Sequence, residues 1–99
     1  RTRASTGSRI AASRTMMAAA KRAQEYDPLA PYPATLIARV LYYARQYDQA
    51  RDQLRKVLDF DPNFTLAHYW LGRSLLAQSA REEAIAELRA AVSLWGAAR

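Results

Sequence analysis

The stretch YWLGRSLLAQSAREEAIAELRAAVSLWG, residues 69–96, decides the fold because another part of the chain repeats its pattern. A shift of 34 residues superimposes it on LIARVLYYARQYDQARDQLRKVLDFDP, residues 36–62. Small and apolar residues then fall on one another, in the pairs Ala38 and Gly72, Leu41 and Leu75, Ala50 and Ala84, and Leu54 and Leu88. A sustained period of this size is typical of a solenoid, in which each repeat is one packed supersecondary unit.

Each period contains two stretches whose apolar residues recur at helical spacing, and the chain is rich in Ala, Leu and Arg. This pattern predicts two amphipathic helices per repeat, joined as antiparallel hairpins by short polar turns near residues 46–48 and 78–80. Ser79 followed by Glu82 has the spacing of a capping box and predicts the start of the last helix. The run 61–63, Asp-Pro-Asn, predicts a helix stop and then a new cap.

Gly72 stands among large packing residues, although glycine in a helix interior costs ~1 kcal/mol relative to alanine. We interpret it as a site of close helix crossing, where a side chain would hold the two helices apart. Ala38 takes the same place one period earlier. Ala50 and Ala84 then provide the facing small surfaces on the partner helices.

The period, the small residues and the turns together resemble the tetratricopeptide repeat family, whose pattern is Trp, Leu-Gly, Tyr, Ala, Phe and Pro. The second repeat offers His68, Leu71, Gly72, Leu75, Ala84, Leu88 and Gly96 at these places, and the first offers Ala34, Ile37, Ala38, Leu41, Ala50, Leu54 and Pro62. The chain departs from the pattern where the large aromatic is Trp70 rather than His68, and where Gly96 replaces proline. The resemblance implies an all-α, right-handed solenoid fragment with repeats at 28–62 and 63–96 and a tail at 97–99.

The N-terminal part differs in charge from the rest. Residues 1–22 hold six basic residues and no acid, whereas residues 23–99 hold nine of each. We expect a flexible basic segment at 1–9, then a helix at 10–27 that is half of a broken repeat, with Met16 and Met17 packed against the next helix. The basic start could bind nucleic acid or an anionic membrane, or be a transit segment, a linker or a tag. No recognition motif accompanies it, so we expect neither nucleic acid nor membrane as a partner of the repeats.

Signals for catalysis are nearly absent. The chain has no cysteine and one histidine, His68, without a second ligand at metal spacing, so we expect a packing role for it. The acidic pairs Glu82–Glu83 and Asp59/Asp61 fit a helix start and a helix end better than a catalytic dyad. No phosphate-binding loop or nucleophile elbow occurs. We therefore expect no enzyme activity, cofactor or metal, and a cytoplasmic location.

In the family that the chain resembles, the first helix of each hairpin lines a concave groove. By spacing, Thr35, Arg39, Tyr42 and Tyr43 share one such face, and Tyr69 and Arg73 continue it on the next repeat. These six are the candidate peptide-binding residues, and paired arginines suit an acidic peptide or a free C-terminus. The chaperone-binding members use a carboxylate clamp with Asn and Lys, which this face lacks. The alternatives are aromatic packing within hairpins and an ordinary solvated surface.

The sequence thus predicts a non-catalytic protein–protein interaction scaffold that presents a groove to a peptide or a neighbouring domain. The alternative follows from the sequence of residues 41–72, which resembles repeats appended to bacterial winged-helix transcription regulators and signalling proteins. On that interpretation the chain is a sensing or oligomerising tail. In both cases Leu88, Val92 and Trp95 leave the C-terminal side uncovered, and we expect it to self-associate or to be covered in the full-length chain.

Overall fold

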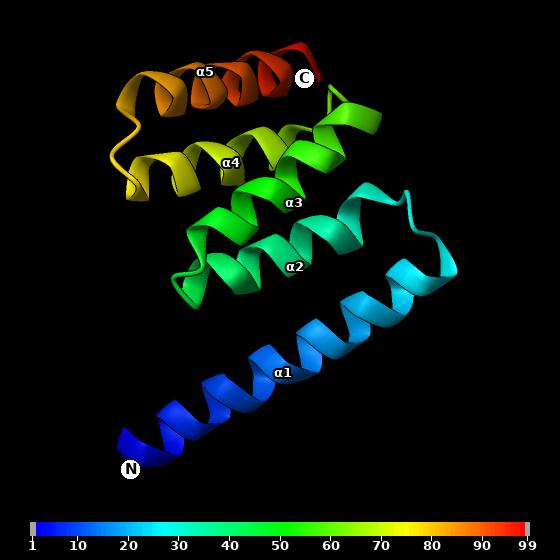
Figure 1. The fold of residues 1–99 in the computed structure, drawn as a ribbon, viewed down its shortest axis with the longest axis vertical. Coiled ribbons are helices and arrows are strands. Elements are labelled where there is room, and N and C mark those ends of the chain that lie inside the picture. The colour runs from blue at the N-terminus through cyan, green and yellow to red at the C-terminus, as the bar shows by residue number, and fades with distance from the viewer. Residues whose placement is uncertain (1, 99) are drawn as a thin grey trace.

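The computed structural model describes residues 2–98 as five α-helices, and it places the side chains of residues 11–97. The helices are α1 (Thr2–Tyr26), α2 (Pro31–Tyr43), α3 (Tyr47–Phe60), α4 (Thr65–Ala77) and α5 (Arg81–Ala98). They stack in chain order, from α1 at one end of the molecule to α5 at the other (Figure 1). Each helix packs against the next, and α2 also packs against α4. This arrangement confirms the expected all-α class built from stacked hairpins.

The connections between hairpins repeat with the same period as the sequence. The Asp27 N–H donates to the Ala23 carbonyl at 2.9 Å, and the Asp61 N–H donates to the Val57 carbonyl at 2.8 Å. A proline follows each aspartate and cannot continue the backbone hydrogen-bond ladder, so both helices end there. The next helices begin after Ala30 and Phe64, without a side-chain cap. The expected cap at residue 63 was therefore wrong, because Asn63 lies outside the helix.

Within each hairpin the turn is closed by the same pair of backbone hydrogen bonds. After α2, the N–H groups of Arg45 and Gln46 donate to the carbonyls of Tyr42 and Leu41. After α4, Ser79 and Ala80 donate to Leu76 and Leu75 in the same way. This is the Schellman arrangement, which needs a left-handed residue, and Arg45 and Ser79 have φ of 65° and 63°.

Ser79 therefore ends α4 and does not cap α5, so the capping-box prediction was wrong. The left-handed backbone at Ser79 belongs to the C-terminal side of the turn, whereas an N-cap has extended or similar backbone. Helix α5 begins at Arg81, and the Ala84 N–H donates to the Ala80 carbonyl. The acids Glu82 and Glu83 lie in its first turn, where the helix dipole favours them.

Small residues occupy the centre of the core. The side chains of Ala38, Ala50 and Ala84 are completely buried, together with the larger Leu54. A Cβ atom added at Gly72 would lie 2.7 Å from Leu88 Cγ and 3.2 Å from the Ala84 carbonyl oxygen. At this crossing α4 and α5 approach so closely that even a methyl group requires movement. Pro62 is exposed and thus contributes through its backbone position and not through burial.

The first helix begins earlier than expected. Helix α1 already starts at Thr2, although the sequence predicted a flexible segment through residue 9. The segment contains no proline, and its one glycine, Gly7, costs only ~1 kcal/mol in a helix, so nothing local breaks the pattern. The side chains of residues 2–10 lie outside the described ones. Further along, Ala20 is buried and α1 packs against α2.

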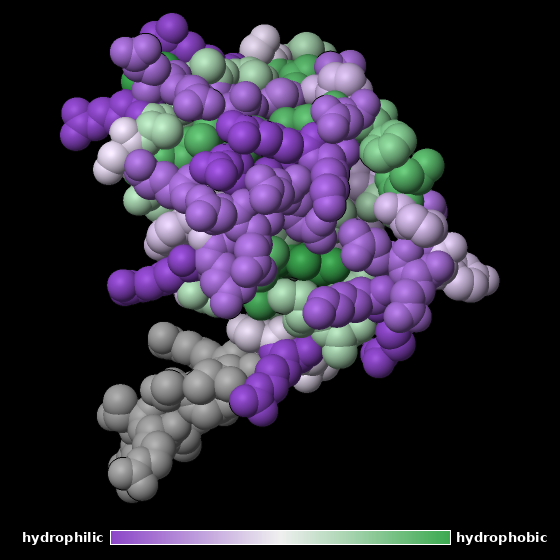
Figure 2. Space-filling model, in the orientation of Figure 1, coloured by the Kyte–Doolittle hydropathy of each residue, from purple (hydrophilic) through white to green (hydrophobic). Residues whose placement is uncertain are grey.

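The C-terminal helix leaves apolar side chains in solvent. Val92 is 70% exposed and Trp95 62%, and Leu88 beside them is half-buried. Elsewhere, hydrophilic side chains cover most of the face seen in Figure 2, and hydrophobic atoms show at the top and in a band at the level of α2. Among the helices of the described chain, none combines the length and the apolar character that crossing a bilayer requires.

Candidate functional site

The candidate site is the face shared by α2 and α4, the first helices of the two hairpins. Five of the six predicted peptide-binding residues meet on this face, and they gather around one residue that the prediction did not include, Trp70. The five are Arg39, Tyr42, Tyr43, Tyr69 and Arg73.

Thr35, the sixth predicted residue, does not take part. Its side chain is only 1% exposed, and its hydroxyl donates to the Pro31 carbonyl of its own helix at 2.7 Å. The prediction was wrong here because tertiary packing buries the start of α2, while the spacing argument assumed a free helix face.

Trp70 is the centre of an aromatic cluster. Its ring is buried, and the rings of Tyr42, Tyr43 and Tyr69 lie edge-on to it, with centroid distances of 5.6, 5.9 and 5.3 Å. Tyr47, at the start of α3, adds a further edge contact to Tyr42 at 5.5 Å. Edge-on pairs of this kind are favourable beyond the area that they bury, so the cluster fixes a rigid platform between two repeats.

Two arginines, one period apart, lie over this platform. The guanidinium carbon of Arg39 lies 5.1 Å from the centroid of Trp70, and that of Arg73 lies 4.9 Å from it. Because both distances refer to the same ring, the two carbons are at most about 10 Å apart, the sum of the two values. Arg73 also lies 5.1 Å from the ring of Tyr42. Cation–π contacts hold both positive charges on the face of α2 and α4.

Two phenol hydroxyls favour the charged form of Arg73. Burial alone would lower the pKa of Arg73, but its hydrogen bonds to Tyr69 and Tyr42 outweigh this effect and raise the pKa above that of an ordinary arginine. The bond to Tyr69 runs from the guanidinium to the phenol oxygen over 3.3 Å. This is a long contact that leaves most of the guanidinium fork available.

Among the described side chains, no acid forms an ion pair with either arginine. In the part of the chain with described side chains, the ion pairs join Arg51 to Asp48 and Arg55 to Glu83, and Glu87 contacts the ring of His68. Arg39 Nε is buried and has no hydrogen-bond partner among the described residues, so only the terminal nitrogens of this guanidinium group can reach a ligand. The two guanidinium groups thus stack on aromatic rings and retain donors that could bind carboxylate oxygens.

His68 has a structural role on another side of α4. Its Nδ1 lies 2.7 Å from a carboxylate oxygen of Glu87, and its Nε2 lies 2.7 Å from the Pro62 carbonyl. The ring thereby ties α4 to α5 and to the preceding turn. The sequence predicted a half-buried packing residue, which is what the structure shows, but it did not reveal Glu87 as the partner.

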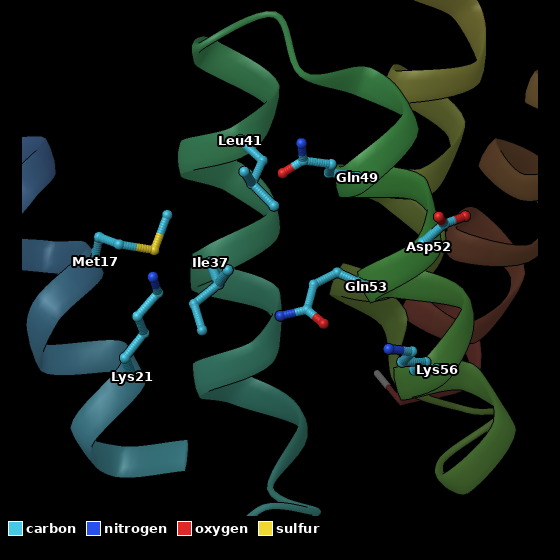
Figure 3. A pocket seen from close by; sticks show the side chains of 8 residues that line it. All are labelled: Met17, Lys21, Ile37, Leu41, Gln49, Asp52, Gln53 and Lys56. Carbon is cyan, nitrogen blue, oxygen red and sulfur yellow. The ribbon is translucent and has the colours of Figure 1, made fainter. Parts of the chain in front are cut away.

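A hollow of about 300 Å³ lies between α1, α2 and α3. Figure 3 shows side chains of all three helices around it, namely Met17, Lys21, Ile37, Leu41, Gln49, Asp52, Gln53 and Lys56. Its charged residues come in both signs, and its apolar part belongs to the contact between α1 and α2. No group of three or more metal-ligating side chains occurs among the described residues. We therefore regard the arginine–aromatic face of α2 and α4 as the better candidate site.

Comparison with solved structures supports the fold. The first tetratricopeptide domain of Spaghetti (RPAP3), bound to the HSP90 peptide SRMEEVD, superposes with a TM-score of 0.74 at 18% identity, over 79% of this chain and 62% of that one. A structure of MamA superposes with a TM-score of 0.75 at 18% identity, over 93% of this chain and 54% of that one. A second MamA structure, MamA MSR-1 C2, gives 0.76 at 18% identity, over 92% and 52%. The chain thus spans between half and two thirds of the length of these proteins.

Sequence comparison identifies the family. No curated protein is similar enough in sequence to count as a relative. The family model described as tetratricopeptide repeat, however, matches residues 35–98, which is more than half of the chain and covers both hairpins except the first turn of α2. Period, turns, small core residues and superposition all agree with that match, and the chain belongs to the tetratricopeptide repeat family.

Proposed function

We propose that this chain is a non-catalytic interaction scaffold that binds an acidic peptide segment on the face of α2 and α4. The observation that carries the proposal is the pair of guanidinium groups over Trp70, for which the described side chains offer no carboxylate partner. A carboxylate can accept two parallel N–H bonds from an arginine fork. The exposed rings of Tyr43 and Tyr69 flank the arginines and offer apolar area with a polar tip.

The spacing of the charges fits an extended ligand. Carbons at most about 10 Å apart can be bridged by carboxylates two or three residues apart in an extended peptide, which advances roughly 3.3 Å per residue. The peptide in the Spaghetti complex, SRMEEVD, is also acidic. The face of this chain lacks the Asn and Lys of the carboxylate clamp, so we propose an acidic ligand of a different sequence.

The test is selection of peptides from a random library on the immobilised protein, followed by titration of the best sequences by fluorescence anisotropy. We expect enrichment of peptides with Asp or Glu, and a loss of affinity of at least tenfold when those acids are changed to amides. Each charge-assisted hydrogen bond is worth roughly 1.5–3 kcal/mol, and about 1.4 kcal/mol corresponds to tenfold in affinity.

The decisive variant is Arg39→Glu with Arg73→Glu, which should abolish binding while helicity stays intact. The matched control is Lys56→Glu with Arg81→Glu, which changes the net charge equally at exposed residues away from the face. Arg39→Lys with Arg73→Lys keeps the charge but loses the planar fork, and should weaken binding by at least tenfold. If the control weakens binding as much as the Glu pair does, attraction is due to net charge alone and the site assignment is wrong.

The remaining parts of the sequence prediction stay proposals. We propose that the C-terminal helix α5 takes part in self-association, because Val92 and Trp95 are exposed on it, and that the protein acts in the cytoplasm. The alternative function, a sensing or oligomerising tail of a winged-helix transcription regulator, would use the same face for a neighbouring domain. No feature of the described residues favours it over a peptide scaffold.

A further inference from the structure

A large apolar hollow lies between α1 and the end of α2, next to the arginine–aromatic face, with which it shares Tyr43. Its volume is about 1050 Å³, and it is lined mainly by apolar atoms. Met16 and Met17 of α1 and Val40 and Tyr43 of α2 contribute to its walls. Met16 is 41% exposed and Tyr43 64%, so these apolar side chains face solvent. Apolar area of this kind on a repeat protein is normally covered by the neighbouring unit.

The repeat itself shows what shape fits the hollow. Helices α3 and α4 stand one period after α1 and α2, and α2 packs against both of them. The residues one period after Met16 and Val40 are Ala50 and Ser74, and both are 0% exposed. The hollow is therefore the place where a helix would lie if the pattern continued by one more element. Its occupant should be an amphipathic helix that runs antiparallel to α1, as the first helix of a hairpin does.

The charge around the hollow indicates the character of that helix. Arg14 and Lys21 line it, Arg22 follows, all three are exposed, and the sequence has no acid before Glu25. The two basic residues at 21 and 22 lie toward the C-terminal end of α1. A helix antiparallel to α1 would place its own N-terminal turn near them, so acids in that first turn would be favourable.

Helix α5 has both required features. Ile85, Val92 and Trp95 are exposed and lie at spacings of seven and three residues, so they form one apolar stripe with the half-buried Leu88. Its first turn carries Glu82 and Glu83 after Arg81, and Glu83 also contacts Arg55 at 3.4 Å, so Glu82 is the acid that carries most of this argument. Over its length α5 has three glutamates against two arginines, which makes it acidic where α1 is basic.

We propose that the hollow between α1 and α2 receives helix α5 of a second copy of this chain. The apolar stripe of α5 lies on Met16 and Val40, and its acidic first turn lies beside Lys21 and Arg22. The proposal rests on the self-association proposed for α5 and adds the surface that receives it. The contact is heterologous, since a donor helix meets a different acceptor surface. After two copies pair, one still has a free α5 and the other a free hollow. Further copies can therefore add as the concentration rises, which gives open oligomers or, where the rotation closes, a ring.

The experiment uses two variants that each block one side. Ala12→Glu with Met16→Glu places acids at exposed positions of the hollow, and Val92→Lys with Trp95→Lys places bases on the stripe of α5. Light scattering after size exclusion, from ~10 µM to ~1 mM, measures the mass of each variant, because a contact of one helix is small and expected to be weak. Circular dichroism confirms that both stay folded. The control is Leu29→Lys with Phe60→Lys, at exposed apolar residues outside both surfaces.

We expect the wild type and the control to grow in mass with concentration, and less so at high salt. Each blocked variant alone should stay monomeric. Their equimolar mixture should give a one-to-one dimer and nothing larger, because one partner offers a free α5 and the other a free hollow.

Three results would overturn the proposal. If the variant with the blocked hollow still dimerises, α5 pairs with α5, which leaves its self-association intact but removes the acceptor surface. If the mixture stays monomeric while the wild type associates, another surface is responsible. If the wild type is monomeric at all concentrations, both this inference and the proposed self-association fail, and the hollow serves a different helix.

Discussion

Replacement of Gly72 by alanine sets two effects of similar size against each other. Alanine is the better helix former by ~1 kcal/mol. The added Cβ, however, would lie 2.7 and 2.8 Å from Leu88 Cγ and Cδ2, and 3.2 Å from the Ala84 carbonyl oxygen. Overpacking of this kind typically costs about 1–3 kcal/mol. We expect the clash to win, so that Gly72→Ala lowers the free energy of unfolding by ~1 kcal/mol and Gly72→Leu by ~3 kcal/mol.

Gly96 provides the matched control. It also lies in a helix, but a Cβ added there would meet no atom within 4 Å. Gly96→Ala should therefore raise the free energy of unfolding by a few tenths of a kcal/mol, since it gains helix propensity near a helix end without a clash. The same substitution then has opposite signs at the two glycines, and only the packing around them differs.

Urea unfolding followed by circular dichroism measures these differences from the transition midpoint. A double-variant cycle with Leu88→Ala isolates the cause, because it removes the two closest atoms that the new Cβ would meet and leaves only the Ala84 carbonyl oxygen at 3.2 Å. In that background Gly72→Ala should become stabilising. If Gly72→Ala raises the stability of the wild type as much as Gly96→Ala does, the helices do not cross closely at this point and the packing argument is refuted.

Four further substitutions test other parts of the protein. Arg45→Gly and Ser79→Gly should each stabilise the protein by ~1 kcal/mol, because both residues have φ near 65° and glycine adopts that backbone without strain; a lower melting temperature would contradict the Schellman turns. His68→Ala should lower the free energy of unfolding by ~1–3 kcal/mol, through loss of the bonds to Glu87 and the Pro62 carbonyl; unchanged urea unfolding would rule out that role. Thr35→Val should leave affinity for acidic peptides within twofold in anisotropy titrations, since the hydroxyl serves its own helix; a tenfold loss would return Thr35 to the site.

The fold could be predicted from the sequence because its determinants are local and repeated. Helical spacing of apolar residues and the shift that pairs Ala38 with Gly72 both survive in the structure. The capping of helices was harder to predict. Ser79 has a side chain suited to an N-cap, yet the backbone hydrogen bonds at the end of α4 place it in a left-handed conformation. The sequence alone did not show whether Ser79 would cap α5 or take the left-handed position after α4.

The candidate site was predicted only in part, because its central contacts cross between repeats. Helix spacing placed Arg39 on one helix and Arg73 on the other, and both lie on the face of α2 and α4. That Trp70 would lie under both of them depends on how α4 is turned against α2, which spacing within one helix does not reveal. Thr35 was wrongly included for the same reason. The i, i+3 spacing of Trp70 and Arg73 could have placed these two side chains next to each other, but not Arg39 beside them.

The two tryptophans differ sharply in surroundings, and this gives the protein an intrinsic optical reporter. Trp70 is 6% exposed beneath the guanidinium groups of two arginines, and Trp95 is 62% exposed on the last helix, α5. Indole emission shifts to longer wavelength in water, so the two residues should contribute separable bands, with only the red one accessible to a soluble quencher. A ligand on the face of α2 and α4 should alter the blue band, whereas docking of α5 should shift and protect the red one. A single emission spectrum, without any label, can then distinguish peptide binding on the face of α2 and α4 from growth of the oligomer.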